Sequence, residues 1–129
     1  MGNHSEKIRR VAVPTEQPGG LEARRSNHFG HAAAFVIADV MDDAIGQVTS
    51  VTNPPHVHGG CMTTVNMLSS HGVTAVVAGG MGRGPLTGLT RAGIHIYYSA
   101  DTATAGEAIQ ALTDGELHAF NTNNACQGH

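Results

Sequence analysis

The sequence predicts a single α/β domain built on a mixed β-sheet, with a parallel second half and helices on its faces. Two observations predict this fold. Three strand-like segments come first, and helical and strand-like segments then alternate, an order typical of helices packed on a partly parallel sheet. Residues 73–78 also form a short, apolar, β-branched run, as central parallel strands do. The length of 129 residues fits one domain.

The first three elements are predicted strands. Residues 7–13 end in an apolar run, and Pro14 should stop this strand because it cannot donate a ladder hydrogen bond. Residues 33–40 are apolar, and residues 42–43 are two aspartates that predict a turn. Residues 45–52 alternate between apolar and polar side chains, which predicts an edge strand paired antiparallel with the preceding one.

Helices and strands alternate in the second half of the chain. Pro85 suits the first turn of a helix, and Thr104 to Glu107 form a capping box. Gly72, Gly93 and Gly115 each follow an apolar helical stripe and should end the three helices. The predicted helices cover residues 61–71, 85–92 and 105–114, and the predicted strands cover residues 73–78 and 94–98.

Composition and charge limit the classes of function. We expect the core of the domain at residues 7–117, followed by a mobile tail at residues 118–129. Residues 1–6 are a polar lead-in that either belongs to the natural protein or was added to it. The formal net charge of −3 disfavours a nucleic-acid partner, and no apolar run is long enough to span a membrane. Two cysteines and no signal-like segment predict a cytoplasmic protein. The sequence does not indicate an oligomeric state.

Side chains that bind soft metals gather in three patches. Imidazole and thiolate suit borderline metals and iron–sulfur-type clusters. Cys61 should open a helix, whose N-terminus favours the thiolate. His31 is either a neighbouring ligand or a supporting hydrogen-bond donor. The candidate ligands are His28, His31, His56, His58, Cys61, Cys126 and His129.

The stretch 79–84 holds four glycines in six residues, more than a tight turn needs, which predicts a ligand close to the backbone. It lacks the spacing of dinucleotide-binding and P-loop motifs. Amides beside an arginine suit an anion. Right-handed crossovers should bring the loops after the first and fourth strands to the same sheet edge. The candidate contacts there are Arg24, Arg25, Gly79, Gly80, Met81 (a soft lid or simply core), Gly82, Arg83 and Gly84.

Two other classes of function remain open at this point. A zinc-binding regulatory or interaction module would use Cys61, Cys126, His129 and one histidine of the 56–58 segment. A module that only binds a partner protein would use none of these residues as metal ligands. An enzyme is not expected, because the aspartates at 39, 42 and 43 have no acidic partners on the first or fourth strand for a two-metal site.

Several motifs together resemble one known family. They are Val-Ala-Val-Pro-Thr (11–15), Ser-Asn-His-Phe-Gly-His (26–31), Gly-Gly-Met-Gly-Arg-Gly-Pro (79–85) and Gly-Ile-His-Ile-Tyr (93–97). Across residues 8–117 the chain is similar to the dinitrogenase iron–molybdenum cofactor-binding family, of the NifX, NafY and NifB C-terminal type. The Ser-x-His-Phe-Gly element is its most specific part.

The resemblance implies a ribonuclease H-like fold of five strands and three helices, in agreement with the predicted order. It also implies the carriage or assembly of an anionic metal–sulfur cluster, with His28 as a ligand. The cluster would contain molybdenum with iron, or molybdenum with copper as in the orange protein of sulfate reducers. Proteins that donate or accept the cluster would be the partners.

Overall fold

The computed structural model describes residues 8–27, 29, 32–41, 44–53, 60–79, 81, 83–99, 102–115 and 117–119. Its strands are β1 (Ile8–Thr15), β2 (Ala34–Met41), β3 (Ala44–Thr52), β4 (Ala75–Ala78), β5 (His95–Tyr98) and β6 (His118–Ala119). Its helices are α1 (Gly60–Ser70), α2 (Arg83–Arg91) and α3 (Ala105–Thr113). The predicted five strands and three helices are therefore confirmed, with one short strand added.

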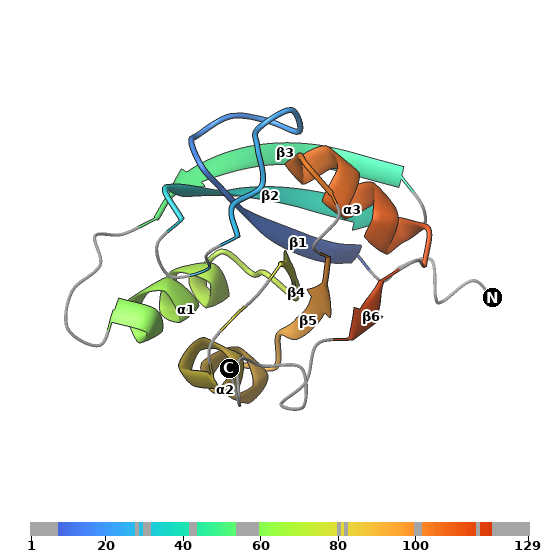
Figure 1. The fold of residues 1–129 in the computed structure, drawn as a ribbon. Coiled ribbons are helices and arrows are strands. Elements are labelled where there is room, and N and C mark those ends of the chain that lie inside the picture. Colours follow the sequence, from blue (N-terminus) through green and yellow to red (C-terminus); the bar gives the residue numbers. More distant parts are fainter. Residues whose placement is uncertain are drawn as a thin grey trace.

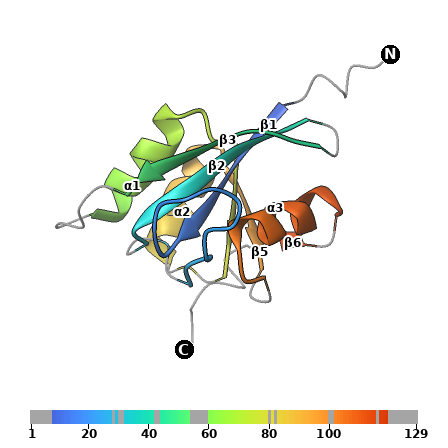
Figure 2. The same cartoon turned by 90° about the horizontal axis from the view of Figure 1, so that it is seen from above.

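The strands form one mixed sheet in the order β3-β2-β1-β4-β5-β6. The ladders between β1, β2 and β3 are antiparallel, and those between β1, β4 and β5 are parallel. Helices α1 and α2 lie on one face of the sheet and α3 lies on the other, as the two views show (Figures 1 and 2). Because β1 and β4 are parallel neighbours, their carboxyl ends meet at one edge of the sheet, as predicted.

Small aliphatic side chains fill the core on both faces. Under α1 and α2, Val65, Leu68, Leu86 and Leu89 pack against the sheet, while α3 packs the other face around Ile109. Each such side chain contributes about 1.5–3 kcal/mol of burial free energy. The predicted glycine stops are also confirmed, because the residues after all three helices have a positive φ, the conformation that glycine adopts at least cost.

The first strand is longer than predicted. β1 continues through Pro14, which pairs with Phe35 of β2. The carbonyl of Pro14 accepts a hydrogen bond from the Ser26 amide at 2.8 Å, so its backbone faces the loop after β1. The proline nitrogen therefore points away from β2, and the ladder loses no hydrogen bond.

Two other boundaries also differ. Helix α2 begins at Arg83, so Arg83 and Gly84 belong to its first turn rather than to the glycine loop. Strand β6 pairs antiparallel with β5, so the first two residues of the predicted tail extend the sheet. The predicted turn at 42–43, the lead-in at 1–6 and residues 120–129 lie outside the described residues.

Candidate functional site

The carboxyl ends of the parallel strands bring three loops together. Arg25 and Ser26 follow β1, Gly79 follows β4, and Thr102 follows β5. Two hydrogen bonds join the loop after β1 to the loop after β5: the Arg25 amide donates to the Ala103 carbonyl at 2.8 Å, and the Arg25 Nε donates to the Thr102 carbonyl at 2.9 Å. Ligands favour this edge in sheets of this class.

Arg25 is the central residue of this edge. It is only 8% exposed, an unusual state for a guanidinium. Besides the bond to Thr102, its Nη1 donates to the Ser26 carbonyl at 3.3 Å, and its backbone bridges Thr15. The side chain therefore fixes the loop after β1 against the loop before α3 and carries a positive charge beneath the surface.

Gly79 lies against this guanidinium. A methyl group at the Cβ position of Gly79 would collide with Arg25 Nη1 and would come within 3.2 Å of both Arg25 Cζ and Asn27 Oδ1. Any side chain here would have to displace the guanidinium, so glycine allows the close approach of Arg25 to this backbone. Gly79 therefore brings the start of the predicted glycine loop into contact with Arg25.

The adjacent Arg24 has a different environment. Its side chain is 68% exposed and lies 3.9 Å from the Glu16 carboxylate. It lines a cavity of about 380 Å³ with Gln17, Glu22 and Thr104, where the loop after β1 meets the start of α3. The two predicted arginines therefore separate, one to the surface and one to the interior.

The N-terminus of α3 faces the same cavity, but its amides are occupied. Ala105 and Gly106 donate to carbonyls of the loop after β1, at 2.9 and 2.8 Å. The Glu107 amide donates to Thr104 Oγ1, which confirms Thr104 as the N-cap, and Glu107 Oε1 accepts from the amide of Ala103, the residue before the cap. These amides are thus not available to an anion.

The Ser-x-His-Phe-Gly motif is anchored on both sides of its histidine. Ser26 is buried and bonded to β1 through its amide. Phe29 is buried in the core and makes an edge-to-face contact with Phe35, with ring centroids 5.4 Å apart. His28 and His31 lie outside the described residues, so their roles stay predictions.

A second anchor, which the sequence did not suggest, sits at Asn53, immediately after β3. Its Nδ2 donates to the Ala32 carbonyl at 2.7 Å, and its Oδ1 accepts from Thr64 Oγ1 of α1 at 2.9 Å. The Asn53 amide also donates to the Ala33 carbonyl at 3.0 Å. This buried group fastens the start of α1, where Cys61 is the second helical residue, to the segment that follows His31.

Met81, Arg83 and Gly84 are the other predicted cofactor contacts that the structure describes. Met81 is 4% exposed and belongs to the core cluster under α1 and α2, so its thioether packs as a core group. Arg83 and Gly84 begin α2 at the same sheet edge. Outside the described residues lie Gly80, Gly82, His56, His58, Cys126 and His129. Their roles stay predictions.

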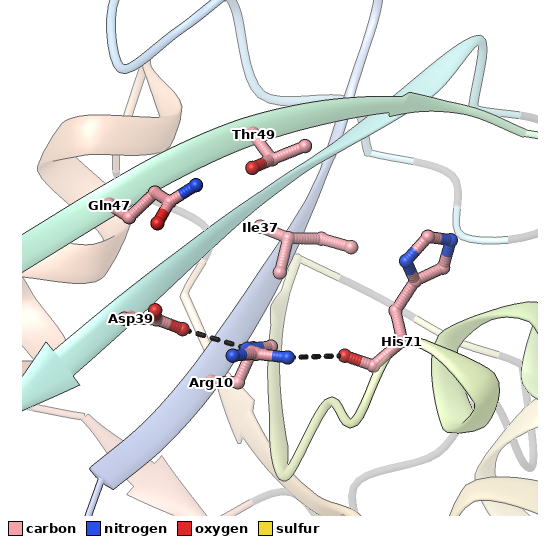
Figure 3. A pocket seen from close by; sticks show the side chains of 6 residues that line it. All are labelled: Arg10, Ile37, Asp39, Gln47, Thr49 and His71. Atoms are coloured by element: carbon pink, nitrogen blue, oxygen red, sulfur yellow. Dashed lines mark hydrogen bonds and ion pairs between the residues drawn. The ribbon is translucent and has the colours of Figure 1, made fainter.

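A smaller polar cavity of about 160 Å³ lies elsewhere, beside the start of β1 and the end of α1 (Figure 3). Arg10 crosses its floor, with Nε 2.7 Å from Asp39 Oδ1 and Nη1 2.9 Å from the His71 carbonyl. Gln47 and Thr49 of β3 complete the rim. Arg10 therefore caps the C-terminal end of α1, because it donates a hydrogen bond to the His71 carbonyl just past that end.

Within the described part of the chain, no group of three or more histidine, cysteine, aspartate or glutamate side chains is arranged to hold a metal ion. No helix of this part is long and apolar enough to cross a membrane.

Several solved structures resemble this one. A Thermotoga protein provisionally named as NifB is 32% identical, with a TM-score of 0.74, over 88% of this chain and 95% of that one. The apo form of the orange protein from Desulfovibrio gigas is 27% identical, with a TM-score of 0.76, over 88% and 93%. A Methanocaldococcus jannaschii protein at 16% identity and a TM-score of 0.68 shares the fold.

Comparison with curated protein sequences finds no match. The sequence model of the family named "Dinitrogenase iron-molybdenum cofactor" matches residues 7–115, which is most of the chain. The motifs that suggested this family lie within that range, and the fold agrees with the solved relatives. The chain therefore belongs to the dinitrogenase iron–molybdenum cofactor family.

Proposed function

We propose that this protein binds an anionic metal–sulfur cluster as cargo and carries it, or helps to assemble it, between donor and acceptor proteins. The cargo would be of the iron–molybdenum type or a molybdenum–copper sulfide. The site is the carboxyl edge of β1 and β4. Family membership supports the class of cargo, and the geometry of this edge supports its placement.

The single observation that carries the proposal is the buried Arg25 guanidinium packed against Gly79 at this edge. A cation held against the backbone at Gly79 attracts an anion that binds at this edge of the sheet. Cluster sulfides also accept hydrogen bonds from backbone amides, which stretch 79–84 would provide.

His28 is the proposed metal ligand. In the sequence it stands between Ser26 and Phe29, which are both buried. A neutral imidazole binds molybdenum, iron or copper through one ring nitrogen, and the other nitrogen needs a hydrogen-bond partner. His31, His56, His58 and Cys61 remain proposed supporting ligands.

The test is purification without oxygen from cells supplied with molybdate, iron and copper, followed by metal and sulfide analysis and a visible absorption spectrum. We expect visible charge-transfer bands and a molybdenum-containing sulfide cluster, whose iron-to-copper ratio identifies its type. The His28→Ala variant should lose most of the chromophore. His95→Ala, an exposed histidine at the opposite end of β5, is the matched control and should keep it. Colourless protein with stoichiometric zinc, or protein with neither metal nor colour, contradicts the proposal.

A further inference from the structure

Arg25 and Gly79 form a unit whose parts depend on each other. The guanidinium occupies the space that a side chain at residue 79 would need. Its Nε and Nη1 donate to the carbonyls of Thr102 and Ser26, which hold the charge in place. These bonds hold the charge beneath the surface, where it lies against the backbone of Gly79.

We propose that Arg25 selects the charge of the cargo from beneath Gly79, so that the site prefers a tetrahedral thiometallate dianion to a monoanion of the same shape. This inference rests on the proposed function, which it deepens by naming a charge-selecting residue. Arg25 acts through the backbone of Gly79 as a positioning residue and not as a ligand.

The physical basis is the low exposure of the charge. Water and salt screen an exposed cation such as Arg24, so it adds little attraction for an anion. A buried cation is screened much less, and its attraction for an anion within about 8 Å is several times the thermal energy at an effective dielectric constant of about 20. That attraction grows with each unit of charge on the cargo, and it therefore favours a dianion.

The test compares two probes, tetrathiotungstate and tetrathiorhenate, which share a tetrahedral shape and differ by one unit of charge. Their dissociation constants are measured by anaerobic spectrophotometric titration, and the quantity of interest is their ratio. In wild-type protein we expect tetrathiotungstate to bind more tightly. In Arg25→Gln, which keeps a donor for Thr102 but removes the charge, this preference should fall by roughly tenfold.

Two further variants test whether the preference depends on a positive charge at residue 25. Arg25→Lys keeps the charge, and its preference should stay within about threefold of wild type. Arg91→Gln removes the same charge from the exposed last turn of α2, roughly 12 Å along the helix from its start, and should leave the preference unchanged. An Arg25→Gln protein that binds both probes with the wild-type preference overturns the inference while leaving the proposed function intact.

Gly79→Ala is an independent variant, because it keeps the charge but forces the guanidinium away. It should weaken tetrathiotungstate binding and lower the preference, with circular dichroism checking that the protein is folded. If Arg25→Gln does not fold, Gly79→Ala becomes the deciding variant. A folded Gly79→Ala protein that binds tetrathiotungstate with the affinity and preference of wild type would overturn the inference. Wild-type protein that binds neither probe overturns both the inference and the proposed function.

Discussion

Replacing Asn53 by alanine should be one of the most damaging single changes near the candidate site. The side chain is buried, donates to the Ala32 carbonyl at 2.7 Å and accepts from Thr64 Oγ1 at 2.9 Å. Truncation leaves both groups without this partner in surroundings that exclude water. Each such loss costs about 1–3 kcal/mol, so Asn53→Ala should lower the free energy of unfolding by about 2–5 kcal/mol. This is a large part of the roughly 5–15 kcal/mol that stabilises a typical domain.

Thr64→Val tests the same network from the other side. It removes one hydroxyl and nearly keeps the volume, so we expect a smaller loss of about 1 kcal/mol. Asn66→Ala makes the same chemical change on an exposed position of α1 and should stay within about 0.5 kcal/mol of wild type. Urea unfolding followed by circular dichroism gives all three values. An Asn53→Ala loss below about 1 kcal/mol, or one equal to that of Thr64→Val, would refute the reasoning.

Three further predictions concern stability and use the same assay. Thr104→Ala removes the cap that accepts from the Glu107 amide and should cost about 0.5–2 kcal/mol; no loss would mean that the cap is not needed. Leu68→Ala opens a cavity at a fully buried position and should cost about 2–5 kcal/mol, and a loss below 1 kcal/mol would contradict this packing. Arg10→Met removes the partly exposed ion pair with Asp39 and should cost only about 0.5–1.5 kcal/mol, so a larger loss would show that the pair is more important than its exposure suggests.

Much of the fold could be predicted because local signals agreed with one another. The apolar run at 73–78 placed β4 in the centre of the sheet, and alternation at 45–52 placed β3 at an edge. The glycines after the three helices marked their ends. Handedness of the crossovers then predicted which loops share an edge. The strand and helix assignments depend on residues close together in the chain, and the shared edge then follows from the order of these elements.

The details of the site depend on distant contacts, and there the sequence was less informative. Arg24 and Arg25 are chemically identical neighbours, yet one is exposed and the other buried, because the bridges to Thr104 and Thr15 turn them to opposite sides. The side chain of Asn53 bonds to the carbonyl of Ala32, 21 residues earlier in the chain. No local pattern encodes either contact.

The central claim is that an anionic metal–sulfur cluster binds at the carboxyl edge of β1 and β4. The most direct test is an anaerobic titration of ¹⁵N-labelled protein with tetrathiomolybdate, followed by amide chemical shifts. The account predicts that the shifts centre on residues 25–33 and 79–84, with little change around Arg10 and Gln47 at the distant polar cavity. Shifts centred on that cavity, or none at saturating tetrathiomolybdate, would contradict it.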